Sequence, residues 1–438
     1  MISTFHCLKH TLKSMKRNNH VMKCNSKRGV QLFGKHFFSV ICVKTLDLTL
    51  CFVNFATKLI QMVDKMLKRI VVKVGSNVLT RKDGSLDVTR MSALVDQIAE
   101  VRRMGTEVVL VSSGAVASGR SELGDGFRCH GRKNNSLKAL DSVGQRQLYS
   151  AVGQAKLINR YYEMFRDHGI SVGQILTTKE SLSTRQDYLN QRNCMMVMLQ
   201  CGVLPIVNEN DTISVTELMF TDNDELSGLV ATMMGADALV ILSNIDGIYT
   251  GAPSEPGAEL IRKVLPGQDL SQYIRTEKSG FGRGGMLTKN RIASKVAEEG
   301  TTVIIANGKR ENILVDIAKG TGDVPCTVFV PSAVEVSSIK KWIAHSDGFA
   351  KGAIHLNEGA TAIVLGEHAA SILPVGVTKV EGDFERHDIV SIVDSYGNNV
   401  GVGRVSLCSD DARSVIGLKD QKPLVHYDYL YLEMRMEN

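Results

Sequence analysis

From residue 66 onward, short apolar runs alternate with segments of helical periodicity. Strand-like runs of three to seven residues, rich in Val, Ile and Leu, lie at 70–74, 108–111, 170–176, 203–207, 238–242 and 303–305. Between them, apolar residues spaced three and four apart predict helices at 88–101, 140–169, 188–200 and 226–234. Strands that alternate with helices predict an α/β fold, in which a mostly parallel sheet is sandwiched by helices.

Polar clusters follow the central strand. Asn208-Glu209-Asn210-Asp211 comes directly after 203–207, and a second cluster, 221–224, begins thirteen residues after Asn208. In open α/β sheets, ligands bind at the carboxyl ends of the strands. Asn both donates and accepts hydrogen bonds and carboxylates accept them, so the first cluster is a candidate site for a substrate with an ammonium group. An ordinary surface turn rich in Asn and Asp is the alternative for one such cluster alone.

Glycine and lysine positions predict binding of an anion. Gly75 and Ser113-Gly114 follow the first two strands, where backbone N–H groups can approach an anion without a Cβ in the way. Lys73 lies inside an apolar run, and a buried lysine requires a partner or a function, whereas a lysine at an exposed edge does not.

A glycine-rich segment, 279–286, precedes a predicted helix that carries Lys289 in its first turns. Its glycines match G-x-G-x-x-G, but no strand precedes them, and no P-loop motif occurs in the chain. We therefore exclude a dinucleotide fingerprint and a P-loop enzyme. The segment predicts a loop that covers nucleotide phosphates, with Lys289 adding positive charge, although an ordinary mobile loop has a similar composition.

Composition and charge divide the chain. Its 438 residues, 43% hydrophobic and 22% charged, indicate a globular protein of more than one domain. The net charge of +6 is uneven: residues 1–65 hold 11 Lys/Arg and two acids, which gives +9, and the remainder carries −3. We expect 1–65 to be a basic extension that is disordered or absent from the natural protein, with Met66 as the start. Its apolar stretch is too interrupted by charge to span a membrane.

Cysteine usage excludes two classes of protein. The nine cysteines include no C-x-x-C pair and no Cys/His pattern at zinc spacing, so neither a disulfide framework nor a structural metal site is predicted. Reduced thiols favour a cytoplasmic location. Cys194 and Cys201 lie seven apart on an apolar helical segment, and we predict that both are buried packing residues.

Five sequence blocks, in order, carry a family resemblance. They are Val72-Lys73-Val74-Gly75-Ser76, Ser112-Ser113-Gly114-Ala115, Val207-Asn208-Glu209-Asn210-Asp211, Asp222-Asn223-Asp224-Glu225-Leu226-Ser227 and Gly282-Arg283-Gly284-Gly285-Met286-Leu287-Thr288-Lys289. Through them, the chain from Met66 to about Ile317 resembles the amino-acid kinase family, and within it the kinases that act on glutamate. The corresponding domain is predicted to span residues 66–329. The resemblance implies ATP-dependent phosphorylation of the side-chain carboxylate of L-glutamate, which gives glutamyl 5-phosphate in the first step of proline biosynthesis.

The resemblance also assigns roles to residues. It implies that Ser113, Asp211 and Asn223 bind glutamate and that Asp224 orients Lys73 and Lys289. The reaction brings two anions together, so it needs charge neutralisation, which the two lysines and a Mg²⁺ bridging phosphate oxygens would supply. The expected ATP-binding residues are Lys73, Ser243, Asn244, Arg283, Gly284, Gly285, Met286, Leu287, Thr288 and Lys289. Ser243-Asn244 stands where the family often has Thr-Asp.

The last part of the chain changes character after a predicted linker at 330–347. Strand-like runs at 362–365 and 389–393, separated by turns at 358–359, 381–383 and 396–398, predict a small C-terminal β-barrel over 348–438. This region resembles a PUA domain through 352–360, 373–377 and 380–384, with His387 where that pattern often has Gly. We also predict a surface insertion at 124–135 from its Gly, Lys and Asn content.

Two alternative functions remain open at this point. One is a kinase of the same family that acts on another small acid, because the substrate is chosen by the site and not by the fold. The other is an RNA-linked regulator that uses the PUA domain. Residues 348–438 hold 8 Lys/Arg against 13 Asp/Glu, a net charge of −5, which argues against a strong RNA-binding surface. The family resemblance further implies a homo-oligomer and a hand-off of the product to glutamyl phosphate reductase, and no membrane partner is expected from the sequence.

Overall fold

The computed structural model describes residues 67–81, 83–124, 140–213, 223–253, 255, 257–273, 285–320, 323–333, 337–346, 349–366 and 369–432. The chain divides into two compact units, Met1–Lys65 and Met66–Asn438. The predicted basic extension at 1–65, and the predicted insertion at 124–135 beyond Gly124, lie outside the described residues. Every helix in the described part of the chain is too short or too polar to cross a membrane.

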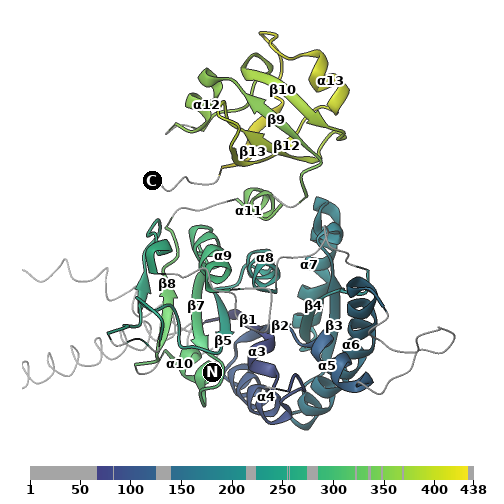
Figure 1. Cartoon of the computed structure of the whole chain (residues 1–438), viewed down its shortest axis with the longest axis vertical. Coiled ribbons are helices and arrows are strands. Elements are labelled where there is room, and N and C mark those ends of the chain that lie inside the picture. The colour runs from purple at the N-terminus through teal and green to yellow at the C-terminus, as the bar shows by residue number, and fades with distance from the viewer. Residues whose placement is uncertain are drawn as a thin grey trace, which may run out of the picture. The chain divides into compact units, whose positions relative to one another are not determined.

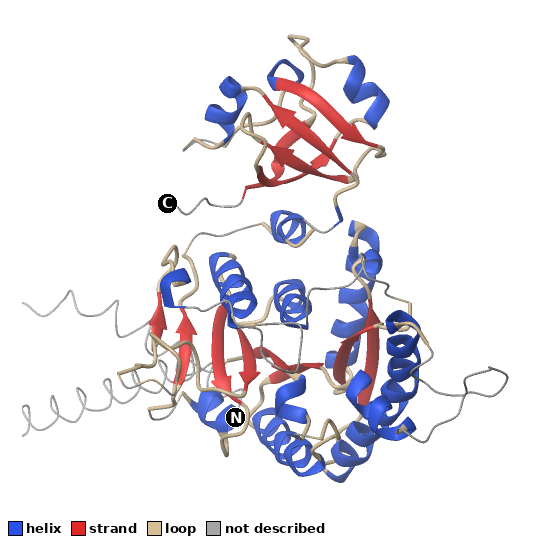
Figure 2. Cartoon of the chain, in the orientation of Figure 1, coloured by secondary structure: helices blue, strands red, loops and turns tan. Residues whose placement is uncertain are grey.

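Eight strands form the larger sheet (Figure 2), and all six predicted strands are among them. Their bounds are β1 Arg69–Val74, β2 Glu107–Ser112, β3 Val172–Thr177, β4 Leu204–Glu209, β5 Ala238–Ser243, β6 Lys263–Val264, β7 Thr302–Asn307 and β8 Cys326–Phe329. The strand order is β3-β4-β2-β1-β5-β7-β8-β6, and every pairing is parallel except β7 with β8. The chain order reverses between β1 and β5, and the crevice at such a switch point is where open α/β sheets bind ligands.

Helices cover both faces of this sheet, as the sequence predicted (Figure 1). Their bounds are α3 Ser76–Leu79, α4 Val88–Arg103, α5 Ala115–Leu123, α6 Ser142–Asp167, α7 Arg185–Gln200, α8 Asn223–Met234, α9 Met286–Glu298, α10 Ile313–Lys319 and α11 Ser338–Ala344, with single 3-10 turns η2 Glu180–Leu182 and η3 Ser271–Tyr273. Helix α11 lies within the segment predicted as a linker.

Alternate residues of each strand enter two separate cores. Val71 and Ile241 pack in one core with α7, α8, α9 and α11, whereas Val72 and Val240 pack in the other with α3, α4, α6 and α10. Because side chains alternate along a strand, Lys73 projects from the same face of β1 as Val71. It therefore points toward the helices on that face, among them α8.

Helices α5 and α6 cross unusually closely at two glycines. A Cβ on Gly153 would lie 1.8 Å from the carbonyl oxygen of Ala115, and one on Gly119 would lie 1.8 Å from that of Tyr149. Real Cβ atoms do not approach backbone atoms so closely, so only glycine fits at either position. The crossing fixes α6 against the segment that follows β2.

The C-terminal region forms a smaller sheet with its own core. Strands β9 Gly352–Leu356, β10 Val377–Gly382, β11 Ile389–Val393, β12 Asn399–Val405 and β13 Val425–Leu432 run in the order β10-β9-β11-β12-β13. The pairing of β9 with β11 is parallel and the others are antiparallel. Helices α12 Glu358–Val364 and α13 Ser409–Ser414 and the 3-10 turn η5 Pro374–Gly376 complete it. The predicted fold class, a mostly parallel α/β sheet sandwiched by helices and followed by a small β domain, is confirmed.

His387 keeps a conformation that usually requires glycine. Its φ is 79°, in the left-handed region, which L residues with a Cβ rarely adopt. The turn before β11 is therefore built with His in place of the Gly that the PUA pattern often has. Gly397, with φ of 87°, forms the turn predicted at 396–398.

Three predictions from the sequence were wrong. The run 362–365 is not a strand: residues 362–364 belong to α12, and Leu365 is its C-cap. The turn predicted at 358–359 is the start of the same helix, which Asn357 caps by accepting a hydrogen bond from the N–H of Ala360 at 2.8 Å. Cys194 and Cys201 are exposed, because α7 buries only Tyr188, Met195 and Leu199.

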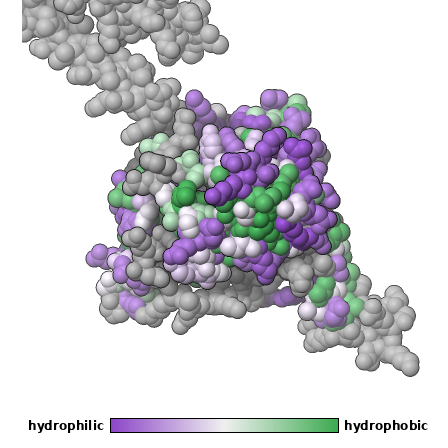
Figure 3. Space-filling view, turned by 90° about the horizontal axis from the view of Figure 1, so that it is seen from above, coloured by the Kyte–Doolittle hydropathy of each residue, from purple (hydrophilic) through white to green (hydrophobic). Residues whose placement is uncertain are grey.

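Hydrophilic residues predominate on the face of the molecule seen in Figure 3, around a smaller group of hydrophobic ones. Exposed apolar side chains of the C-terminal region include Ile363, at 64% exposure, and Leu373, at 43%. The exposure of Ile363 agrees with the amphipathic character of α12, whose Thr361 and Val364 are buried.

Candidate active site

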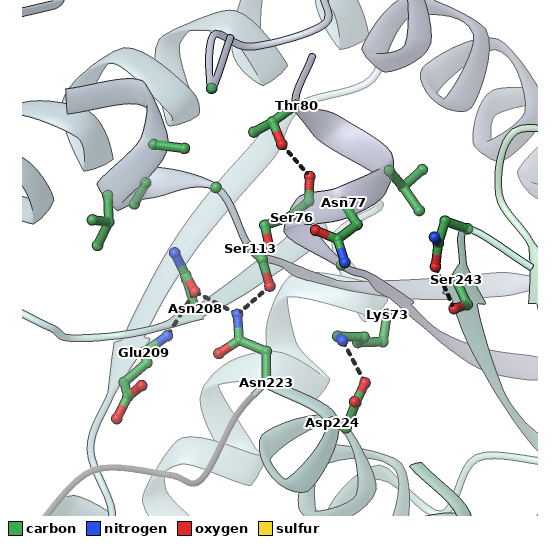
Figure 4. A pocket seen from close by; sticks show the side chains of 18 of the residues that line it. Lys73, Ser76, Asn77, Thr80, Ser113, Asn208, Glu209, Asn223, Asp224 and Ser243 are labelled. Atoms are coloured by element: carbon green, nitrogen blue, oxygen red, sulfur yellow. Dashed lines mark hydrogen bonds and ion pairs between the residues drawn. The ribbon is translucent and has the colours of Figure 1, made fainter. Parts of the chain in front are cut away.

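A cavity of about 940 Å³ lies at the carboxyl ends of β1, β2, β4 and β5. Its walls combine residues from these strand ends with residues from α5, α6, α8 and α9, and Figure 4 shows ten of the lining side chains with labels. The cavity thus occupies the switch point of the sheet, where the sequence predicted a site.

Two lysines converge on one buried carboxylate in this cavity. Lys289 Nζ donates to Asp224 Oδ2 at 2.9 Å. Lys73 Nζ forms an ion pair with Oδ1 of the same carboxylate, and Figure 4 shows this second pair. The side chain of Asp224 is fully buried, and those of Lys73 and Lys289 are 6% and 11% exposed. The three residues predicted to be catalytic lie on β1, α8 and α9, and they therefore meet at one point.

The charge state of Asp224 follows from its two partners. Burial works to raise its pKa, but the charges of Lys73 and Lys289 and their hydrogen bonds lower the pKa from 3.8 to about 2. Asp224 is therefore ionised at neutral pH, and the three groups together carry one positive charge. That charge lies where an anionic reactant would meet the ends of β1 and β5.

Two of the glycines that line the cavity, Gly75 and Gly114, follow the ends of β1 and β2. Gly114, the N-cap of α5, has a φ of 106°, which disfavours any residue with a Cβ. The first N–H groups of a helix have no intrahelical partner, so the start of α5 presents donors to the cavity. A Cβ on Gly75 would lie 3.6 Å from Lys73 Nζ, so this glycine is adjacent to the cationic group.

Asn223 joins the ends of β2 and β4. Its Nδ2 lies 2.9 Å from Ser113 Oγ and 2.9 Å from Asn208 Oδ1, and 3.3 Å from the carbonyl oxygen of Ser112. Asn208 Oδ1 also accepts a hydrogen bond from the N–H of Glu209. Ser113 and Asn223, two of the residues predicted to bind glutamate, thus lie in direct contact.

Asp211, the third residue predicted to bind the substrate, pairs with an arginine that was not predicted from the sequence. Arg146 Nη2 on α6 donates to Asp211 Oδ1, and it lies 3.9 Å from Glu209 Oε2. Arg146, Glu209 and Asp211 all line the cavity. This end of the cavity therefore contains two carboxylates and one guanidinium.

A signal for the α6 residues did exist in the sequence. Ser142, Gln145, Arg146 and Tyr149 all line the cavity and are spaced at i, i+3, i+4 and i+7, which places them on one face of a helix. A polar stripe of this kind is normally read as a solvated face. Only the close packing of α6 on α5 shows that it faces a cavity.

The fold brings some of the predicted nucleotide-binding residues together in this cavity. Ser243, Asn244, Gly285, Met286 and Lys289 line the cavity together with Lys73. Leu287 and Thr288 lie on the first turn of α9 but are not among the lining residues, and Leu287 is 49% exposed. Arg283 and Gly284 lie outside the described residues.

Comparison with known proteins identifies the family to which the chain belongs. The amino acid kinase family model matches residues 68–307, and the PUA domain model matches residues 352–427. The chain is 67% identical over 365 residues to the glutamate 5-kinase of Bacteroides thetaiotaomicron, covering 83% of this chain and 98% of that protein.

More distant relatives agree. The chain is 47% identical to the glutamate 5-kinase of Chlorobaculum tepidum over 368 residues, with 83% and 97% of the two chains covered. It is 38% identical to that of Methylococcus capsulatus over 378 residues, again with 83% and 97% covered. The chain therefore belongs to the amino acid kinase family, and within it to the glutamate 5-kinases.

Proposed function

We propose that this protein transfers the γ-phosphoryl group of ATP to the side-chain carboxylate of L-glutamate, which gives glutamyl 5-phosphate for proline biosynthesis. The observation that carries the proposal is the convergence of Lys73 and Lys289 on Asp224 at the switch point of the sheet. Attack of a carboxylate on a phosphate brings negative charges together, and two fixed cations lower that repulsion.

Each group has a role that follows from its contacts. Asp224 holds the two ammonium groups in place, so that they are positioned before the reactants arrive. Backbone N–H groups near Gly75 and at the start of α5 donate to phosphate or carboxylate oxygens. A carboxylate is already a nucleophile at neutral pH, so no general base is required. Ser113 and Asn223 orient the substrate beside these donors.

Magnesium fits this arrangement if the nucleotide supplies most of its ligands. Within the described ranges, no group of three or more His, Cys, Asp or Glu side chains is placed to hold a metal ion. Asp224, at the centre of the site, is already in contact with two lysines. Mg²⁺ in kinases is held largely by phosphate oxygens and water, and it would add positive charge at the transferring phosphoryl group.

The same proposal includes the finer expectations. The catalytic domain comprises residues 66–329, the linker 330–347 and the PUA domain 348–438, and the enzyme works in the cytoplasm as a homo-oligomer. An acyl phosphate hydrolyses readily, so a direct hand-off to glutamyl phosphate reductase would protect the product from water. The net charge of −5 over 348–438 supports a PUA domain that does not bind RNA strongly.

The test is an ATP-turnover assay on the full chain with hydroxylamine present to trap acyl phosphate. L-glutamate is compared with D-glutamate, aspartate, N-acetylglutamate and carbamate. We expect hydroxamate with L-glutamate and little with the others. ATP consumption with a different acceptor would show that the assignment of L-glutamate as substrate is wrong. Folded protein that binds ATP but phosphorylates none of these acceptors would show that the proposed enzyme function is wrong.

A further inference from the structure

Arg146 has a binding capacity that its present contacts do not use. Its side chain is 23% exposed and pairs with Asp211, but its Nε is buried and lacks a hydrogen-bond acceptor among the described residues. A guanidinium has five N–H donors in a planar fork that matches a carboxylate. A buried donor without an acceptor is costly, and a ligand carboxylate beside Arg146 would remove that cost.

Contacts of α6 outside the Arg146 side chain fix this helix beside the end of β4. Gln147 Nε2 donates to the carbonyl oxygen of Thr212 at 2.9 Å, and Gln154 Nε2 donates to that of Glu209 at 3.1 Å. The glycine crossing at Gly153 fixes the same helix against α5. The position of Arg146 relative to residues 209–212 is therefore set by contacts that do not involve its own side chain.

Charges differ between the two ends of the cavity. At the ends of β1 and β5, Lys73, Lys289 and Asp224 sum to one positive charge, which suits a reacting carboxylate and a phosphate. Beyond β2, at the end of β4, Arg146 stands beside two carboxylates, Glu209 and Asp211. The far end of an amino acid carries an ammonium and a carboxylate, so it needs acceptors and a cation side by side.

We propose that Arg146 binds the α-carboxylate of the substrate amino acid, and that the Arg146–Asp211 ion pair opens when the substrate arrives. Arg146 then contacts the α-carboxylate while Asp211 contacts the α-ammonium, so an internal ion pair is replaced by two pairs with the substrate. This inference rests on the proposed function and adds a specificity-determining residue to it. With both contacts, the site would bind a free amino acid more tightly than a simple diacid or an amine.

Among the described residues, Arg120 also lines the cavity, and it suits this role less well. Its side chain is exposed and its guanidinium lies 5.6 Å from the centre of the Tyr149 ring. An exposed cation already has water as a partner and gains little from a ligand, whereas the half-buried Arg146 gains more.

Two analogues separate the charges of the substrate. Glutarate is glutamate without the ammonium, and 4-aminobutyrate is glutamate without the α-carboxylate. The experiment measures kcat and KM for L-glutamate, and inhibition constants for both analogues, in the full-length wild type, Arg146→Met, Arg146→Lys and Asp211→Asn. Arg160→Met is the matched control, because Arg160 lies on α6 in an exposed pair with Glu163 and does not line the cavity.

We expect the substitutions at Arg146 and at Asp211 to have opposite effects on the two analogues. Arg146→Met should raise KM for glutamate and the inhibition constant of glutarate by about 10- to 100-fold, the range expected for a lost charge-assisted hydrogen bond, and leave that of 4-aminobutyrate unchanged or lower. Asp211→Asn should do the reverse for the two analogues. Arg146→Lys should lie between wild type and Arg146→Met, and Arg160→Met should match wild type.

Other outcomes overturn the role of Arg146. If Arg146→Met weakens 4-aminobutyrate and spares glutarate, Arg146 acts only by positioning Asp211. If the analogues bind too weakly to compete, glutamate decides: an unchanged KM in Arg146→Met, or a fall in kcat alone, refutes the proposal. Wild-type turnover of glutamate is measured first, because its absence counts against the proposed function and not against Arg146.

Discussion

At the scale of single residues, the central feature is a buried carboxylate that two ammonium groups keep ionised. Asp224 would be expensive to bury alone, and Lys73 and Lys289 would be equally expensive without it. Each therefore depends on the others, and the cluster contributes to stability as well as to the proposed chemistry. The lowered pKa of Asp224 sets the pH range in which this contribution to stability can be measured.

Stability supplied by Asp224 should disappear in acid. The pKa of this group is about 2 in the folded protein against an ordinary value of 3.8, so the folded state holds the proton less tightly than the unfolded state. The contribution is then fully present above about pH 4 and is lost as the pH falls toward about 2. Urea unfolding of wild type and Asp224→Asn should show a large difference in midpoint at pH 6 that narrows below pH 4.

The control is an exposed carboxylate on α4. Asp96, at 61% side-chain exposure, pairs with His168, and surface pairs contribute at most about 1 kcal/mol. Asp96→Asn should therefore shift the midpoint little at either pH. A difference between wild type and Asp224→Asn that stays constant from pH 6 to pH 2.5 would contradict the pairing described for Asp224.

Single residues differ in how far the sequence could identify them. Lys73 was identifiable because a lysine inside an apolar strand is anomalous, and Gly114 because glycine follows a strand end. Arg146 was not, because its partner Asp211 is 65 positions away and the packing of α6 on α5 brings them together. A long-range ion pair leaves no local pattern in one sequence.

At the scale of elements, the α5–α6 crossing connects packing to the site. Gly153→Ala would place a Cβ 1.8 Å from the carbonyl oxygen of Ala115 and 2.6 Å from the N–H nitrogen of Gly119, so the helices must separate. Overpacking of this kind costs about 1–3 kcal/mol or more. We expect a lower melting temperature and a higher KM for glutamate, because α5 begins at Gly114 and α6 carries Arg146.

Gly359→Ala is the matched control for this substitution. Gly359 is also a helical glycine, in α12, but the nearest atom to an added Cβ is Asn357 Oδ1 at 3.6 Å, which is an ordinary contact. Alanine should then stabilise the protein by about 0.5–1 kcal/mol by restricting the unfolded chain. Equal effects of the two substitutions on calorimetric melting would show that the close crossing is not required.

Three helix C-termini meet at a second buried ion pair. Glu299, directly after α9, accepts a hydrogen bond from Thr232 Oγ1 of α8 at 2.7 Å and lies 3.1 Å from Nε2 of His345, which caps α11. Burial works to raise the pKa of Glu299, but His345 and Thr232 lower it, with a net decrease. Helix C-termini carry partial negative charge, so a carboxylate there depends on its hydrogen-bond partners, Thr232 and His345.

Removal of His345 should therefore be strongly destabilising. His345→Ala leaves the buried carboxylate of Glu299 without the imidazole that it contacts, and breaking a buried pair of this kind typically costs about 3–5 kcal/mol. In a double-mutant cycle with Glu299→Ala, measured by urea unfolding, the two effects should be clearly less than additive. Additive effects, or a loss below about 1 kcal/mol for His345→Ala, would show that the pair contributes little.

The elements themselves were predictable where the apolar period was unambiguous. All six predicted strands of the larger sheet exist, because a run of Val, Ile and Leu between polar breaks has few alternatives. The run 362–365 was predicted as a strand because β-branched Ile363 and Val364 favour strands, but the Asn357 cap and the burial of Thr361 and Val364 favour the helix that the structure shows. Helix α8 begins at Asn223, earlier than its apolar pattern, which brings Asp224 into its first turn.

At the scale of the whole molecule, charge separates the parts of the chain. Residues 1–65 carry +9 and all later residues −3, with −5 in the last 91 residues from Gly348. A family with PUA domains invites the expectation of RNA binding, but binding to RNA rests on cations that neutralise phosphates. By this criterion the basic extension is a better candidate for contact with nucleic acid than the C-terminal region is.

This division gives the last prediction. The full chain and a chain that begins at Met66 are compared for binding of a structured RNA at about 50 and 200 mM salt, and for glutamate-dependent hydroxamate formation. We expect weak binding by the full chain that falls steeply with salt, since each neutralised phosphate adds to the salt dependence, and none by the shorter chain. Catalysis should be equal in both, because all the described site residues lie in the unit Met66–Asn438. Salt-resistant binding by the shorter chain would instead assign RNA recognition to residues 348–438, and unequal catalysis would give the basic extension a role in the site.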